Sequence, residues 1–271
     1  MSKSNSINST LVSAIVQYSA RYRDEMLGKF KPETLLTDWW AALDFFFGRA
    51  CFQGRRDKIS ERVYNAVISV LEPVFSKDKN AMAYLNEQAN GWERIKQELS
   101  KHIGKGKVGK ARDVEMVISS LQFIGRLTNL NFVRYTVDKI HDGQINEHYK
   151  EIQRSKNSNG IVQVGPKIAS FYLRDVVSIF KLESKVPIEF SFQLQPIDVW
   201  VRKLVHKTGI APYEAKDAEI QNAIVTLCKK YGFSPLQFNQ GAWYVGYFSF
   251  DLLLEQLMNS EVKLQIAEIS T

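Results

Sequence analysis

The amino-acid sequence predicts an all-α protein. Apolar residues recur three and four positions apart through most of the chain, which is the spacing of one face of an α-helix. Pro32, Pro166 and Pro235 stand where helices would begin, and Gly232 stands where one would end. A single short run, Ile188–Leu194, alternates in the manner of a strand. Since no internal repeat occurs, we expect one helical unit spanning residues 1–271.

The composition favours a polyanionic partner. The 271 residues carry a formal net charge of +7 with a pI near 9.2, which indicates nucleic acid first and an anionic membrane second. Cys51 and Cys228 lack a partner motif, so neither a disulfide framework nor a zinc ribbon is expected. Residues 1–10 lack the apolar run of a signal peptide, and the apolar stretch 39–47 is too short to cross a bilayer. We therefore expect a cytoplasmic protein, nucleoid-associated or nuclear according to its source, with no membrane partner.

Helices account for most of the first half of the chain. One is expected over 10–27, and the next begins at Pro32 and is apolar on almost its whole circumference through Phe47, as a buried helix would be. A third is expected to be capped by Ser60 and ended by Pro73, and a fourth covers 81–102.

A basic, glycine-rich segment follows at 101–113. Gly104, Gly106 and Gly109 formally satisfy the G-x-G-x-x-G pattern, but no strand is predicted before them, so we interpret the match as accidental. The segment is instead typical of a loop that displays its basic side chains, Lys105 and Lys107 among them. Such a loop is either simply solvated or a contact for DNA phosphates.

The second half of the chain also reads as helical. Helices are expected over 113–126, 132–153 and 215–231, and from Pro235 onward. A polar loop at 154–160 forms the clearest break in the chain.

The segment that indicates chemistry is Val164–Lys167, at the head of an apolar-striped helix. Gly165 permits a sharp turn and a close approach of the backbone to a ligand. Pro166 suits the first helical position, and the amides after it point outward at the positive end of the helix dipole, where a phosphate can bind. These features describe the second half of a helix–hairpin–helix, which grips the DNA backbone without recognising its sequence. Lys167 follows on the first turn, where it is either a phosphate contact or a nucleophile.

A second motif, Pro196–Ile197–Asp198, lies near another helix start, where Asp198 suits a helix cap. Together the two motifs resemble the helix–hairpin–helix, Gly/Pro-Asp superfamily of DNA base-excision glycosylases. The matching residues are Val164, Gly165, Pro166, Lys167 and Ala169 in the first motif and Pro196, Ile197, Asp198, Val201 and Arg202 in the second. The long interval between Lys167 and Asp198 looks most like the archaeal-type 8-oxoguanine glycosylases. The resemblance covers roughly residues 130–250.

The resemblance implies a fold and an activity. The fold has two packed helical subdomains, approximately residues 1–130 and 131–250, with the active site in the cleft between them. The activity is that of a DNA glycosylase and abasic-site lyase acting on double-stranded DNA with a damaged base, 8-oxoguanine being favoured. In that family, a lysine at the position of Lys167 forms a Schiff base with the sugar, and β-elimination nicks the strand. Nearly all active members need the aspartate matched by Asp198.

The resemblance also implies binding residues. Gly165 and Val164 would contact the DNA backbone, together with Lys105 and Lys107 of the basic loop. The segment 238–246 looks like the late helix of the same group, in which Trp243 would stack on the flipped base. Asn239, one helical turn earlier, would contact the base edge, although Trp243 equally suits a core position.

The chain departs from the family in its hairpin. Family hairpins usually have the sequence Leu-Pro-Gly-Val-Gly, whereas Ile161, Val162 and Gln163 replace the first three residues here. Gln163 therefore stands where a glycine is expected.

Two other functions remain open. One is a monofunctional glycosylase for alkylated bases, with Lys167 only touching phosphate, and the other is a non-catalytic helical DNA-binding protein that keeps the fold. His141 and His148 are interpreted as surface residues rather than metal ligands. We expect a monomer with no metal and no cofactor, although backbone carbonyls of related hairpins can hold a monovalent cation.

Overall fold

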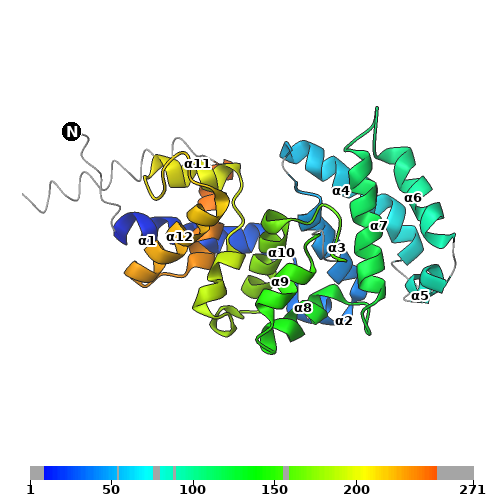
Figure 1. The fold of residues 1–271 in the computed structure, drawn as a ribbon, viewed down its shortest axis with the longest axis horizontal. Coiled ribbons are helices and arrows are strands. Elements are labelled where there is room, and N and C mark those ends of the chain that lie inside the picture. The colour runs from blue at the N-terminus through cyan, green and yellow to red at the C-terminus, as the bar shows by residue number, and fades with distance from the viewer. Residues whose placement is uncertain (1–8, 54, 76–79, 88–89, 155–158, 249–271) are drawn as a thin grey trace, which may run out of the picture. The chain divides into compact units, whose positions relative to one another are not determined.

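The structure is a computed structural model that describes residues 9–53, 55–75, 80–87, 90–154 and 159–248 (Figure 1). Over these residues the chain folds into helices joined by turns, which confirms the all-α class. No strand occurs among them, and β-type pairing is limited to two isolated bridges, Ile103 with Val108 and Gln153 with Ile161. None of the helices in these ranges has the length and hydropathy that a membrane span requires.

The chain divides into two compact units. Unit 1 comprises Met1–Lys29 and Pro187–Thr271, and unit 2 comprises Phe30–Val186. The division lies at these residues rather than near residue 130. The reason is that the first helix packs with the C-terminal segments instead of with the helices that follow it.

Unit 2 has its core around the second of its helices. Its elements are α2 (Pro32–Thr37), α3 (Trp39–Ala50), α4 (Asp57–Phe75), α5 (Asn80–Glu87), α6 (Gly91–His102), α7 (Ala111–Gly125), α8 (Phe132–His141), α9 (Ile145–Glu151), α10 (Pro166–Ile179) and the 3-10 helix η2 (Glu183–Lys185). Helix α3 contacts both α8 and α10 (Figure 1). Phe46 of α3 packs edge-on against Phe132 of α8 at a centroid distance of 4.9 Å, and Phe132 stacks on Tyr172 of α10 at 4.9 Å. These buried rings fix the apolar face of the helix that carries Lys167.

A buried charge cluster lies in the same core. Asp175 of α10 is fully buried and accepts a hydrogen bond from Nε of Arg49 at 3.0 Å. Arg174 donates to the same carboxylate through Nε at 3.0 Å and through Nη2 at 2.9 Å. The Arg49 guanidinium also lies over the Phe45 ring, 3.9 Å from its centroid. Two guanidinium groups therefore share one carboxylate away from water, which is tolerable only while every partner is present.

A second polar network runs from the surface of unit 2 into its core. His148 is fully buried, with Nδ1 3.2 Å from a carboxylate oxygen of Glu151 and Nε2 2.9 Å from Oγ1 of Thr136. Thr136 in turn lies 2.9 Å from the Tyr172 hydroxyl. Burial lowers the pKa of His148, so the ring is held neutral and bridges Thr136 and Glu151. The expectation of a surface histidine was wrong for His148.

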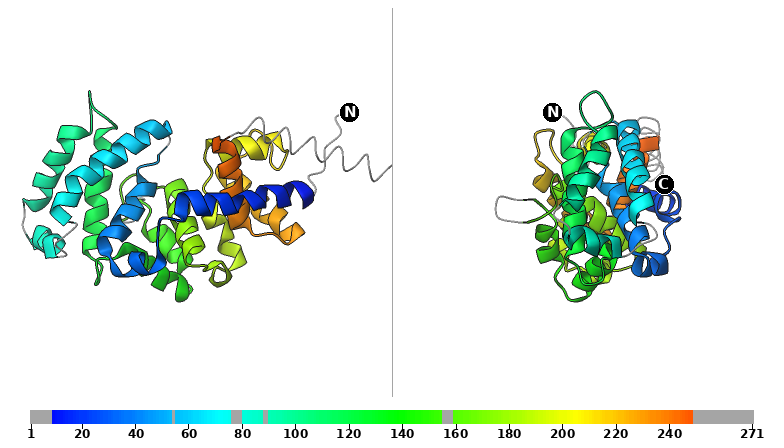
Figure 2. Two further views of the ribbon diagram at one scale, coloured as in Figure 1. Left: turned by 180° about the vertical axis from the view of Figure 1, so that it is seen from behind. Right: turned by 90° about the vertical axis from the view of Figure 1, so that its right-hand side faces the viewer.

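Unit 1 is built from two segments that are far apart in the sequence. It contains α1 (Ser9–Tyr22), the π-helix η1 (Arg23–Leu27), the 3-10 helix η3 (Ile188–Leu194), α11 (Val199–Lys207), α12 (Asp217–Tyr231) and a helix at 235–248. Helix α1 crosses the helix at 235–248 closely (Figure 2). A Cβ atom on Gly241 would lie 1.9 Å from the Ile15 carbonyl oxygen, so only glycine permits this crossing.

One predicted continuous helix, one predicted helix start and one predicted stop were wrong. The helix expected from Pro32 to Phe47 is two helices, because Asp38 caps α3 by accepting hydrogen bonds from the amides of Trp40 at 2.9 Å and Ala41 at 3.2 Å. Helix α4 begins at Asp57 rather than at Ser60. It also continues through Pro73, which is tolerated because it lies in the last turn.

Two further predictions were wrong in the second half of the chain. The helix expected over 132–153 is broken by Gly143, whose φ of 73° lies in the left-handed region. The run Ile188–Leu194 forms a 3-10 helix instead of a strand. Alternation over so few residues does not distinguish a strand from a tight helical turn.

We expect Asp175→Asn to destabilise the protein by about 3–5 kcal/mol, because it leaves two buried guanidinium groups without a counter-charge. Urea unfolding followed by circular dichroism measures the change, with the exposed Glu72→Gln as a control that alters stability by less than about 0.5 kcal/mol. A loss for Asp175→Asn no greater than that of the control would contradict this account of the core.

Candidate functional site

The segment between α9 and α10, residues 152–165 and hereafter the α9–α10 turn, is tied together by its backbone. Ile161 donates its amide to the Ile152 carbonyl at 3.1 Å, and Arg154 donates to the Val164 carbonyl at 3.1 Å. The Val164 amide itself donates to Ile161 at 3.1 Å. Both backbone groups of Val164 are therefore used inside the turn, and its side chain is buried. The role of Val164 is to hold the turn together.

The left-handed residue of this turn is Gln163. Its φ is 63°, a region that glycine enters at little cost and other residues enter at about 1–2 kcal/mol. Gly165 instead has φ −100° and ψ −172°, which is extended backbone open to any residue. The sharp turn expected at Gly165 therefore lies two residues earlier. The chain adopts it with glutamine where a glycine would be less strained.

Lys167 stands in the first turn of α10, after the cap residue Gly165 and Pro166. Its side chain is half-buried, and within the described part of the chain it makes no hydrogen bond or ion pair. Its electrostatic neighbour is Asp57, the first residue of α4. Partial burial raises the pKa of Asp57, and the positive charge of Lys167 acts in the opposite direction. Nothing in the sequence pattern pointed to Asp57.

The residues beside Asp57 connect it to α7. Arg55 binds the buried carboxylate of Asp113 with two hydrogen bonds, at 2.7 and 2.9 Å. The same carboxylate accepts the Lys110 amide at 2.7 Å. Asp113 thus fixes both the start of α7 and the segment that leads to Asp57, as a bidentate arginine pair does well.

Asp198 is the cap residue of α11. Its Oδ1 accepts hydrogen bonds from the amides of Trp200 at 3.0 Å and Val201 at 2.8 Å. Two N–H donors at a helix N-terminus stabilise a negative charge on this carboxylate. Val199, the next residue, is 67% exposed, so the start of α11 lies at the surface of unit 1.

Asn239 lies directly behind the Asp198 turn. It is fully buried, and its Nδ2 donates to the Pro196 carbonyl at 3.3 Å. This bond attaches the helix at 235–248 to the segment that positions Asp198. The contact of Asn239 with a base edge stays a prediction.

Trp243 belongs to an aromatic cluster. Its ring stacks on Tyr247 with centroids 4.8 Å apart and planes 10° apart, and it meets Tyr22 edge-on at 5.4 Å. Tyr247 also meets Phe248 at 4.9 Å. One face of the Trp243 ring is therefore covered by Tyr247, so a stacked base would take the other face or the place of Tyr247.

One polar residue next to this cluster has no counterpart in the sequence-based prediction. Gln240 is fully buried, and neither Nε2 nor Oε1 has a hydrogen-bond partner in the described part of the chain. It lies three and seven positions before Trp243 and Tyr247, on the same helix face. An unpaired buried amide costs about 1–3 kcal/mol.

The basic segment forms a compact turn between α6 and α7, residues 103–110, hereafter the α6–α7 turn. Lys105 is exposed, whereas Nζ of Lys107 donates to the Ser100 carbonyl at 2.6 Å. Lys107 therefore stabilises the loop internally. No strand precedes the turn in the described chain, in agreement with an accidental glycine pattern.

The predicted residues divide between the units. Lys167, Gly165, Val164, Lys105 and Lys107 belong to unit 2, and Asp198, Asn239 and Trp243 belong to unit 1. Within unit 2, the structure brings Lys167 near Asp57. Within unit 1, it brings Asn239 against the turn that carries Asp198.

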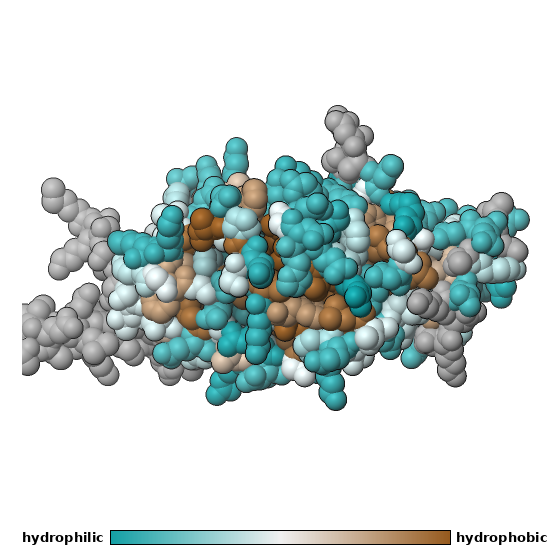
Figure 3. Space-filling view, turned by 90° about the horizontal axis from the view of Figure 1, so that it is seen from below, coloured by the Kyte–Doolittle hydropathy of each residue, from teal (hydrophilic) through white to brown (hydrophobic). Residues whose placement is uncertain are grey.

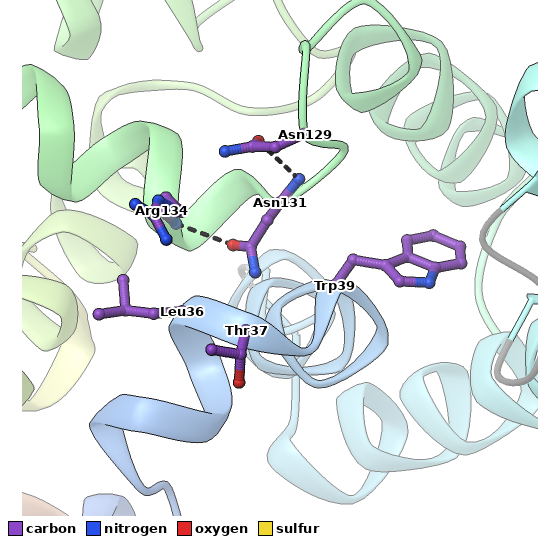
Figure 4. Close-up of a pocket in the computed structure, with 6 residues that line it drawn as sticks. All are labelled: Leu36, Thr37, Trp39, Asn129, Asn131 and Arg134. Carbon is purple, nitrogen blue, oxygen red and sulfur yellow. Dashed lines mark hydrogen bonds between the residues drawn. The ribbon is translucent and has the colours of Figure 1, made fainter.

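Other surface features lie apart from these residues. A pocket of about 450 Å³ in unit 2 is lined by Leu36, Thr37, Trp39, Asn129, Asn131 and Arg134 (Figure 4). Asn131 is committed to structure there, since Nδ2 donates to the Leu35 carbonyl at 2.9 Å and Oδ1 accepts the Arg134 amide at 2.8 Å. The face in Figure 3 is mostly hydrophilic, with hydrophobic residues between the polar ones. No three side chains suited to hold a metal gather within the described residues.

Comparisons of the chain with protein-family models, with curated proteins and with solved structures find no match. Its function is therefore argued from the residues above.

We expect Gln163→Gly to stabilise the protein by about 1 kcal/mol, because it removes left-handed strain and a buried, unpaired Nε2. Gly165→Ala is the matched control. It should change stability by less than about 0.5 kcal/mol, since a Cβ there meets nothing within 4 Å. Urea unfolding of both variants measures the change in the free energy of unfolding. If Gly165→Ala lowers stability more than Gln163→Gly does, this description of the turn is wrong.

Proposed function

We propose that this chain is a base-excision DNA glycosylase with abasic-site lyase activity, acting on an oxidised purine, with 8-oxoguanine favoured. The observation that carries the proposal is the α9–α10 turn leading into Pro166 and Lys167. It keeps a closed backbone and a left-handed residue although the family glycine is replaced by Gln163. A left-handed residue at position 163, where the family pattern has a glycine, supports the proposal.

The proposed partner is double-stranded DNA. The first-turn amides of α10 lack helical acceptors, and Pro166 has no amide to offer, so the helix start suits a phosphate oxygen. The net charge of +7 supports attraction to a polyanion. The helix–hairpin–helix and the two-subdomain arrangement are part of this proposal, as is action as a monomer without a cofactor.

The damaged base has to leave the stack before chemistry can occur. Trp243 and its neighbouring rings offer a stacking surface in unit 1. Gln240 adds an amide with an acceptor and two donors, a set that can pair with the edge of a purine. Binding there requires the aromatic side chains beside Gln240 to move aside.

Asp198 would act through its charge. Cleavage of the glycosidic bond leaves positive charge on the sugar, and an ionised carboxylate nearby stabilises it. The two amides that hold Oδ1 also orient the carboxylate, so the cap and the catalytic role are compatible.

Lys167 would act as the nucleophile. As a neutral amine, its Nζ attacks C1′ of the sugar, and the base departs with the bonding electrons and gains a proton. The amine then loses its proton, the sugar ring opens as the C1′–O4′ bond breaks, and O4′ takes a proton, which leaves a Schiff base at C1′. This Schiff base acidifies the C2′ proton, and removal of that proton expels the 3′ phosphate by breaking the C3′–O bond. Exclusion of water by bound DNA favours the neutral amine that the attack on C1′ requires.

Asp198→Asn is expected to abolish base release while leaving the fold intact, because asparagine caps a helix as well as aspartate but carries no charge. The measurement is release of 8-oxoguanine from a duplex with one such lesion, with a loss of at least about 100-fold expected. Asp38→Asn is the matched control, since Asp38 caps α3 with the same pair of bonds and the same following tryptophan position.

Full activity in Asp38→Asn together with the loss in Asp198→Asn would separate charge from capping. Retained base release in Asp198→Asn would remove Asp198 from the mechanism. No base release by the unmodified protein, on 8-oxoguanine or on alkylated bases, would favour the non-catalytic DNA-binding function.

A further inference from the structure

We propose that the α6–α7 turn is a second clamp for the backbone of duplex DNA, built on the same plan as the α9–α10 turn. The inference rests on the proposed function only for the identity of the ligand. It does not depend on the chemistry of Lys167.

The two turns share a backbone pattern. In each, an isolated parallel bridge follows the first helix, at Gln153–Ile161 and at Ile103–Val108. In each, the next residue donates its amide to the carbonyl of a valine, from Arg154 to Val164 at 3.1 Å and from Gly104 to Val108 at 3.0 Å. In both, a glycine follows that valine. Helix α10 begins directly after Gly165, whereas Lys110 is the cap residue between Gly109 and the start of α7 at Ala111.

The α6–α7 turn is firm at its base and open at its tip. Gly104, Gly106 and Gly109 all have positive φ, at 131°, 77° and 70°. A Cβ on Gly109 would lie 2.8 Å from the Val63 side chain, so the base of the turn is tightly packed. Gly106 is exposed, and a Cβ on it would meet nothing within 4 Å. The tip can therefore be approached closely by a ligand, as a phosphate-binding turn requires.

Basic side chains in and next to the α6–α7 turn are exposed to solvent and can contact a ligand. Lys105, Lys110 and Arg112 are exposed, and within the described residues their side chains form no hydrogen bond or ion pair. Lys107 is excluded as a contact, since its Nζ is bound to the Ser100 carbonyl. Lys105 and Lys110 flank the glycine-rich tip, which suits two phosphate contacts.

The turn is also linked to Lys167. Asp113 binds the Lys110 amide on one side and the Arg55 guanidinium on the other. Asp57, the electrostatic neighbour of Lys167, follows Arg55 by two residues, a backbone span of at most about 7 Å. The Arg55–Asp113 pair therefore ties the start of α7 to the segment that leads to Asp57, the electrostatic neighbour of Lys167. A duplex held by both would be gripped at two places near the proposed nucleophile.

The test is DNA binding by the full chain, with a duplex that carries one tetrahydrofuran abasic analogue, measured by fluorescence anisotropy as NaCl is varied. The double variant Lys105→Ala/Lys110→Ala should weaken binding on the order of 10-fold. It should also reduce the slope of log K against log salt by ~1.8, which corresponds to about two lost phosphate contacts.

The control is Lys31→Ala/Lys185→Ala, which removes the same charge from exposed positions of unit 2 outside both turns. Equal slopes for the two double variants would overturn the second clamp while leaving the glycosylase proposal intact.

Discussion

The packing of α10 against α3 and α8 determines where the proposed nucleophile stands. Phe46, Phe132 and Tyr172 form a continuous stack of buried rings, and Asp175 adds a carboxylate between two buried arginines one turn further along α10. Rotation of α10 about its axis would break both the aromatic contacts of Tyr172 and the ion pairs of Asp175. Lys167, in the first turn of that helix, therefore leaves the core at a fixed place. The activity of the chain, if the proposal holds, depends on this packing.

The turns on either side of the buried helices are controlled by short-range polar contacts. Asp113 fixes the start of α7 and the Arg55–Asp57 segment, and Asp198 and Asp38 each cap a helix with one oxygen and two amides. Carboxylates in these positions fix backbone direction at low energetic cost. The same geometry serves a structural role at Asp38 and a proposed catalytic role at Asp198. Capping geometry alone therefore does not distinguish a structural aspartate from a catalytic one. What separates the two roles is whether activity needs the negative charge of the residue.

The helical class and the head of α10 could be predicted because both depend on local patterns: apolar spacing, Pro166 at the first helical position and Gly165 before it. The predictions failed where one or a few residues decide the conformation of a turn. Asp38 and Gly143 divide stretches whose apolar periodicity continues across them, and Ile188–Leu194 is too short for its period to decide. Asp57, Gln240 and the Arg55–Asp113 pair could not be predicted, since each owes its position to residues distant in the sequence. His148 was misjudged for the same reason, because its partner Thr136 lies on another helix, as does Tyr172, to which Thr136 is bonded in turn.

The central claim is that Nζ of Lys167 forms a covalent bond with the sugar of a damaged nucleotide. Borohydride trapping on a duplex with one 8-oxoguanine tests it most directly, since reduction converts the Schiff base into a permanent protein–DNA adduct. The account predicts an adduct with the unmodified chain and none with Lys167→Ala, while Lys181→Ala, on the same unit, still forms it. An adduct that survives Lys167→Ala, or no adduct on either this duplex or one with an abasic site, would contradict the account.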